Sequence, residues 1–170
     1  GPEVDLPGGK SFTDRDGKFQ LKMLSTSSFH PLARSMAPML KEESFHLGTG
    51  NNGLRRILKA GRVPTEVVQR YFNKWVPTAF DLFGTDNSSS AHWAYVWGLK
   101  GRFDERETQD EANLAHLNEA SRELYRQEIT RLVDRLNTAI PDPEQHLRVP
   151  DSKFHRKIGL YARQHFKING

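Results

Sequence analysis

The stretch Met39–Gly53, MLKEESFHLGTGNNG, contains two patterns that indicate different chemistries, and the choice between them decides the fold. Glu43-x-x-His46 has the spacing by which one helix offers a carboxylate and an imidazole to a metal ion. The segment GTGNNG that follows has the spelling of a dinucleotide-binding turn. Such a turn needs a β-strand immediately before its first glycine, and the residues here predict a helix instead. The sequence therefore favours the metal pattern.

Helical periodicity surrounds the metal pattern. Pro31 is typical of the first turn of a helix, so a helix is expected to begin near it. At 100° per residue, seven side chains of this helix fall within an arc of roughly 120°. They are Leu32, Met36, Met39, Leu40, Glu43, His46 and Leu47. Glu43 and His46 are therefore expected on the buried stripe, and Gly48 and Gly50 are expected to end the helix.

Burial is what makes the Glu-x-x-His spacing informative. An ionised carboxylate on an apolar stripe costs several kcal/mol unless it is paired or bound to a cation. A histidine three residues later gives that cation a second ligand. A buried Glu43–His46 hydrogen bond without metal explains the same periodicity, so both interpretations stay open on periodicity alone.

A third candidate ligand lies on the preceding segment, where a helix is expected from Phe12 to about Ser25. The midpoint between Asp14 and Glu43 falls at residues 28–29, inside the predicted turn. An antiparallel hairpin would therefore bring the two carboxylates to the same height. Ferritin-like di-iron sites take one carboxylate from one helix and a Glu-x-x-His from its neighbour. Asp14 also suits a helix start, so a purely structural role is the alternative.

The rest of the chain also predicts helices, and strand-like alternation is almost absent. Apolar residues at helical spacing run from Val68 to Trp75, and Pro77 is expected to kink or end that segment. Residues 86–90 supply N-cap side chains for a helix over 91–97. Another amphipathic helix is indicated by Tyr125, Ile129, Leu132, Val133 and Leu136. The predicted fold class is all-α.

The length of 170 residues suits a single domain. Residues 1–11 are rich in glycine and proline and predict an irregular lead-in. Residues 12–140 are expected to form a helical domain that contains the hairpin over 12–50. Prolines at positions 141 and 143 end the helical pattern, so residues 141–170 are interpreted as a C-terminal extension.

Composition excludes several classes of function. The chain has no cysteine, so any metal must be held by His, Asp, Glu or backbone oxygen. Lys and Arg are interspersed with Asp and Glu, so the net charge of +4 does not indicate a nucleic-acid partner. No stretch approaches the ~20 apolar residues of a membrane-spanning helix, and no secretory apolar segment is present. We expect a cytoplasmic protein without a membrane partner.

Three segments together carry a family resemblance. They are FTDRDGKFQL from Phe12, MLKEESFHLGTGNNGLRRIL from Met39 and LFGTDNSSSAHWAYVWGLKGRFDE from Leu82. They resemble the benzoyl-CoA 2,3-epoxidase family, the oxygenase component of aerobic benzoate degradation. The resemblance runs from about Phe12 to Asp104. It implies a ferritin-like helical bundle, of which this chain would hold half of the four-helix core together with C-terminal helices.

The resemblance also implies a reaction. Members of the family are di-iron monooxygenases that insert one oxygen atom of O2 into the ring of benzoyl-CoA, giving the 2,3-epoxide. Their electrons come from NADPH through a separate flavin and iron–sulfur reductase. Carried over to this sequence, the resemblance implies that Asp14, Glu43 and His46 are iron ligands. Arg55 and Arg56 lie just past the glycines and are candidates for the phosphates of the CoA thioester.

One departure from the family matters for the site. The family uses three further ligands, a Glu and a second Glu-x-x-His, and no second Glu-x-x-His exists in these 170 residues. The chain therefore resembles the later portion of the enzyme and holds half of a site. The remaining ligands would come from an N-terminal half on other polypeptide, or from a second copy paired about a two-fold axis.

Two other functions fit the residues. One is a metal-free helical interaction or scaffold domain in which the Asp14, Glu43 and His46 side chains form a hydrogen-bonded cluster. The other is a ferritin-like hairpin dimer that oxidises iron. In the oxygenase interpretation, an apolar wall is expected to exclude water from the metal. That wall consists of Met36, Met39, Leu40 and Leu47.

Overall fold

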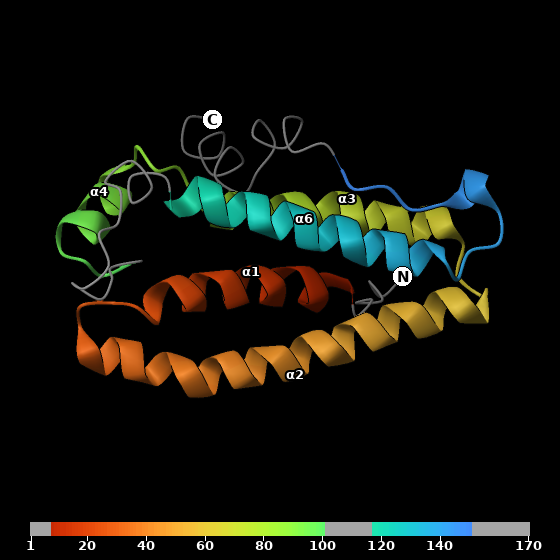
Figure 1. Cartoon of the computed structure of the whole chain (residues 1–170). Coiled ribbons are helices and arrows are strands. Elements are labelled where there is room, and N and C mark those ends of the chain that lie inside the picture. The colour runs from red at the N-terminus through yellow and green to blue at the C-terminus, as the bar shows by residue number, and fades with distance from the viewer. Residues whose placement is uncertain (1–7, 101–116, 151–170) are drawn as a thin grey trace, which may run out of the picture.

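The structure, a computed structural model, describes residues 8–100 and 117–150, and every regular element in these ranges is helical. The prediction of an all-α fold is confirmed. The α-helices are α1 (Gly8–Leu24), α2 (His30–Ala60), α3 (Thr65–Leu82), α4 (Ser89–Val96) and α6 (Leu117–Asn137), followed by a short 3-10 helix, η1 (Pro143–Gln145). Figure 1 shows α1 lying between the long α2 on one side and α3 and α6 on the other. The arrangement agrees with a ferritin-like helical bundle.

Helices α1 and α2 form the predicted antiparallel hairpin. The turn between them spans residues 25–29, where the midpoint of Asp14 and Glu43 placed it. Pro31 lies in the first turn of α2, as expected. Helix α1 begins at Gly8, so the last residues of the predicted lead-in over 1–11 are helical, which corrects that boundary. Residues 1–7 of the lead-in lie outside the described residues.

Helix α2 does not end at Gly48 or Gly50, and this prediction was wrong. The helix continues to Ala60 and ends at Gly61, whose φ of 62° lies in the left-handed region and whose N–H donates to Leu58 O at 3.1 Å. A glycine inside a helix costs about 1 kcal/mol relative to alanine. Burial of Leu47, Leu54 and Leu58 along one face of the same helix outweighs that cost.

These two classes of glycine predict opposite effects of the same substitution. A Cβ at Gly48 would meet nothing within 4 Å, so Gly48→Ala should stabilise the chain by about 1 kcal/mol through helix propensity. Gly61→Ala is the matched control on the same helix. It should destabilise by about 1 kcal/mol because alanine disfavours a positive φ. Urea unfolding of both variants tests this pair, and a loss of stability in Gly48→Ala would contradict it.

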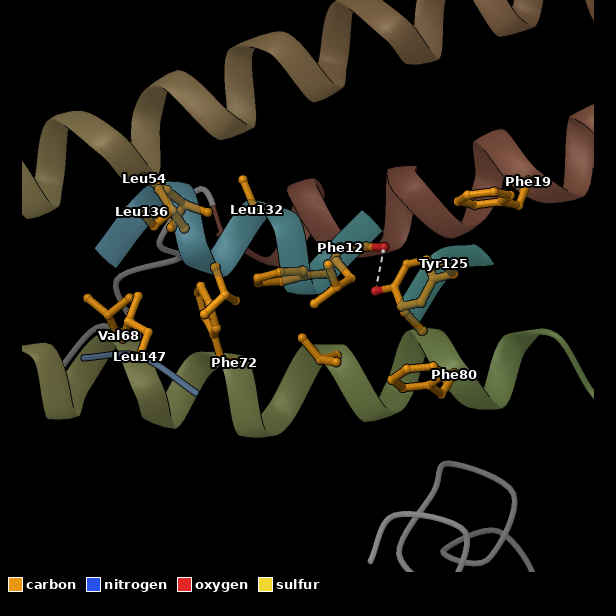
Figure 2. Packing of buried hydrophobic residues seen from close by; sticks show 14 of the residues in the cluster. Phe12, Phe19, Leu54, Val68, Phe72, Phe80, Tyr125, Leu132, Leu136 and Leu147 are labelled. Carbon is orange, nitrogen blue, oxygen red and sulfur yellow. Dashed lines mark hydrogen bonds between the residues drawn. The ribbon is translucent and has the colours of Figure 1, made fainter. Parts of the chain in front are cut away.

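The hydrophobic core lies between α1, α3 and α6 (Figure 2). Phe12 of α1 packs edge-on against Phe72 of α3, with ring centroids 4.6 Å apart. Tyr125 of α6 is fully buried against Phe80 of α3, and its hydroxyl donates to Phe12 O at 3.3 Å. Since one face of α1 supplies this core, its opposite face is left to meet α2.

The remaining helices follow the predictions closely. Helix α3 continues through Pro77 to Leu82, so this proline does not end it. Ser88 caps α4 by accepting a hydrogen bond from the N–H of Ala91 at 3.2 Å. Helix α6 ends at Asn137, ahead of the prolines that were expected to stop it. Of the predicted C-terminal extension, residues 151–170 lie outside the described residues, as do residues 101–104 of the resembling segment.

Candidate metal centre

The three predicted ligands meet between α1 and α2. Asp14 of α1 and Glu43 and His46 of α2 each offer one ligand atom, and these atoms all lie within 4.8 Å of one another. Two atoms bound to the same transition-metal ion at about 2.1 Å each are at most about 4.2 Å apart. Small side-chain rotations would therefore be enough to bring the three atoms onto one ion.

The site is partly buried, and Glu43 is its most enclosed glutamate. The Glu43 side chain is 24 % exposed, whereas that of His46 is 46 % exposed. Glu43 Oε2 is buried and has no hydrogen-bond partner among the residues that the structure describes. His46 Nδ1 lies 4.0 Å from Glu43 Oε2, which is too long for a hydrogen bond. A Glu43–His46 hydrogen bond, which the metal-free interpretation needs, is therefore not formed.

Negative charge gathers at this point. The pKa of Glu43 is raised above its ordinary value, first by burial and then by the nearby carboxylate of Asp14. His46 opposes the shift, and Glu42 adds to it. A cation between Asp14 and Glu43 would remove this repulsion and supply the partner that Glu43 Oε2 lacks among the described residues.

A glycine lets α1 come close to Glu43. A Cβ at Gly17 would lie 3.7 Å from Glu43 Oε1, which is ordinary van der Waals contact. Gly17 lies three residues after Asp14 and so shares its side of α1. Larger side chains at this position would extend into the space that the Glu43 carboxylate occupies.

The predicted apolar wall is only partly present. Met36 and Leu47 are buried, and Leu40 is half-buried. Met39 is 45 % exposed, which contradicts its placement in a water-excluding wall. The expectation that His46 lies on a buried stripe is also wrong for the described part of the chain. The reason is that α1 contacts one edge of the predicted 120° arc, while Met39 and His46 lie toward the other edge.

Sequence comparison identifies the family. A family described as "Phenylacetic acid catabolic protein" matches residues 10–163. The chain belongs to this family. The matched range includes both helices of the candidate metal centre, from which Asp14, Glu43 and His46 project.

Two curated relatives of this phenylacetic acid catabolic protein family are similar over most of the chain. Benzoyl-CoA oxygenase component B from Aromatoleum evansii is 32 % identical over 203 aligned residues, covering 93 % of this chain and 43 % of the relative. The A-type polypeptide of 1,2-phenylacetyl-CoA epoxidase from Escherichia coli (strain K12) is 27 % identical over 151 residues, covering 86 % of this chain and 44 % of the relative. The chain thus spans less than half the length of either relative.

A charged network beside the metal centre was missed by sequence reasoning. In this family member Arg15, the residue after Asp14, is only 3 % exposed. Its Nη1 donates to Glu128 Oε1 of α6, and its Nη2 donates to Asn51 Oδ1 of α2 at 2.9 Å. Lys18 also pairs with Glu128, at 3.1 Å. A usable signal existed, because Arg15 falls on one helical stripe with the buried core residues Phe12, Phe19 and Met23.

Arg55 and Arg56 lie further along α2 and are exposed. With Asn52 and Lys59 they line a shallow, open groove. At 100° per residue, the midpoint of the two arginines lies roughly 160° around the helix from the midpoint of Glu43 and His46. The groove therefore faces away from the metal centre. None of the helices in the described ranges is long and apolar enough to cross a membrane.

Proposed function

We propose that this chain is the later portion of a di-iron monooxygenase that epoxidises the ring of an aryl-CoA thioester. The proposed substrate is benzoyl-CoA, the product its 2,3-epoxide, and the oxidant O2, with electrons from NADPH delivered by a flavin and iron–sulfur reductase. The observation that carries the proposal is the meeting of Asp14, Glu43 and His46 between α1 and α2. The family and the names of the two relatives support the substrate class.

The donor set suits iron. Two carboxylates and one imidazole offer two oxygen ligands and one neutral nitrogen, a combination that fits a divalent transition metal such as ferrous iron. The buried Glu43 Oε2, without a hydrogen-bond partner in the described ranges and beside the Asp14 carboxylate, is the position where a cation is most needed. These observations on the residues present support the assignment of Asp14, Glu43 and His46 as iron ligands.

Further ligands are needed for a di-iron centre, because three side chains cannot complete two ions. No second Glu-x-x-His occurs in the 170 residues. We propose that the remaining ligands come from polypeptide outside this sequence, in keeping with the greater length of both relatives. The exposed side of Met39, Phe45 and His46 is the surface that this polypeptide would cover. A second copy of the chain would approach the same surface.

The chain's own residues would contribute positioning and charge to the reaction. Iron bound here would supply the activation of O2 that the organic ring cannot accomplish alone. Asp14 and Glu43 compensate the charge of the metals, and their side chains can change the way they coordinate as that charge changes. His46 adds a neutral nitrogen donor. Met36 and Leu47 close the buried side of the site against water.

For the phosphates of the thioester we propose Arg55 and Arg56. Arg55 lies nine residues beyond His46, so the two are separated by about 13 Å along the helix axis. The CoA arm would have to pass around α2 to reach the groove. In the complete enzyme, replacing both arginines by alanine should raise KM for the thioester by about fivefold and leave kcat unchanged, since the contacts lie far from the reacting ring. Steady-state kinetics measure this, and an unchanged KM would remove both residues from the substrate site.

The proposed function is tested by reconstitution. The chain is combined with the remaining polypeptide of the oxygenase, ferrous iron, the reductase, NADPH and benzoyl-CoA under ¹⁸O2. We expect one ¹⁸O atom in an epoxide product and no product when His46→Ala replaces the wild-type chain. If the assembled complex binds iron and consumes NADPH but leaves benzoyl-CoA and phenylacetyl-CoA unchanged, the aryl-CoA assignment is wrong.

A further inference from the structure

The charged network at Arg15 joins three helices at one point. Its guanidinium on α1 donates to Asn51 of α2 and to Glu128 of α6, and the Arg15 side chain is 3 % exposed. Burial alone would raise the pKa of Glu128, but Arg15 and Lys18 together lower it below its ordinary value. The pair is therefore ionised at neutral pH, and each bond from the guanidinium is assisted by charge or directed at a fixed acceptor.

We propose that Arg15 is a positioning residue for the metal centre. By binding Asn51 and Glu128 at the same time, its guanidinium fixes the height and rotation at which α1 presents Asp14 to Glu43 and His46. The inference rests on the proposed metal site and adds to it a residue that touches neither metal nor substrate.

The need for such a contact follows from helix geometry and from the length of aspartate. A slip of one residue along α1 moves a side chain by about 1.5 Å along the axis and turns it by about 100°. Metal–ligand distances are held within about 0.2 Å. Glu43 can follow a small slip by changing rotamer, but Asp14 is one methylene shorter and has less reach. The backbone of α1 must therefore be placed correctly beforehand.

Apolar packing alone does not set this register. Phe12, Phe19 and Met23 bury one face of α1, but burial of apolar surface is non-directional and tolerates small slips. A planar guanidinium with two fixed acceptors on two other helices does not. Fixing register is also the best-supported role of buried polar groups in helical proteins.

Cobalt(II) titration of the chain, followed by its visible absorption band, tests the proposal. Wild-type chain should bind cobalt(II), and Arg15→Met should bind it at least tenfold more weakly with an altered band. Stability is separated from positioning by the double variant Arg15→Met/Glu128→Met. Replacing a buried ion pair by apolar side chains commonly restores stability. We expect this double variant to recover its unfolding midpoint but not its cobalt affinity.

A control variant completes the design. Val68→Ala removes two buried methyl groups from α3, away from Asp14, and should lower the unfolding midpoint while leaving cobalt affinity within twofold of wild type. Recovery of cobalt affinity together with stability in the double variant would overturn the positioning role alone. Failure of the wild-type chain to bind cobalt(II) would overturn the proposed metal site, and with it the role of Arg15.

Discussion

Replacing Glu43 by alanine should weaken metal binding by at least 100-fold, which corresponds to about 2.7 kcal/mol. Glu43 is the carboxylate that faces both Asp14 and His46, and its Oε2 has no hydrogen-bond partner among the described residues. Its loss would leave Asp14 and His46, on two different helices, without the ligand between them. Calorimetric titration with ferrous iron under anaerobic conditions measures the change.

The neighbouring glutamate supplies the matched control. Glu42 is 71 % exposed and lies outside the cluster of three ligands, so Glu42→Ala should keep the affinity within about threefold of wild type. The unfolding midpoint of the metal-free protein separates the two interpretations. Because burial and Asp14 raise the pKa of Glu43, removing its charge should not lower the stability of the metal-free protein. A metal-free structural cluster would instead lose stability while iron affinity stayed as it was.

Replacing Glu128 by alanine should destabilise the chain by about 3 kcal/mol, because it leaves the buried Arg15 guanidinium without its anionic partner. Glu123 lies on the same helix and pairs with Arg126 at 3.3 Å, but both of those side chains are substantially exposed. Glu123→Ala should therefore cost less than about 0.5 kcal/mol. Urea unfolding at pH 7 compares the two variants, and equal costs would show that burial of Arg15 has no energetic consequence.

The cost of losing Glu128 should depend on pH in a defined direction. Its pKa in the folded chain is lowered from the ordinary value of 4.5 by Arg15 and Lys18, which overcome the opposing effect of burial. An acid with a lowered folded pKa binds fewer protons in the folded state than in the unfolded state. Its stabilising contribution is therefore complete above about pH 4.5 and is lost as the pH falls through the folded value. The stability difference between wild type and Glu128→Gln should shrink over that acidic range, and a difference that grew would contradict the assignment.

The sequence predicted the metal centre through the symmetry of a hairpin. Asp14 and Glu43 are equally distant from the turn, and the structure places them together as that distance requires. Local residue preference failed where packing opposed it, since Gly48 and Gly50 should end a helix by propensity but α2 continues through them. Periodicity also gave an arc wide enough to include Met39 and His46, although α1 covers only part of it.

The Arg15 network was missed for a different reason. Asp14, Arg15 and Asp16 alternate in charge, a pattern typical of a solvated surface. Helical spacing nevertheless puts Arg15 and Asp16 on the core side of α1, where both are 3 % exposed. Burial raises the pKa of Asp16 to about 7. The partners of Arg15 come from α2 and from α6, 113 residues away for Glu128, and no local pattern predicts so distant a pairing.

The position of bound iron tests the central claim most directly. Crystals of the chain grown anaerobically with ferrous iron would be measured at the iron absorption edge, and an anomalous difference map would locate the metal. The account predicts a peak between α1 and α2, about 2.0–2.2 Å from a carboxylate oxygen of Asp14, one of Glu43 and a ring nitrogen of His46. Iron bound elsewhere on the chain, with the Asp14 carboxylate turned to solvent, would contradict it.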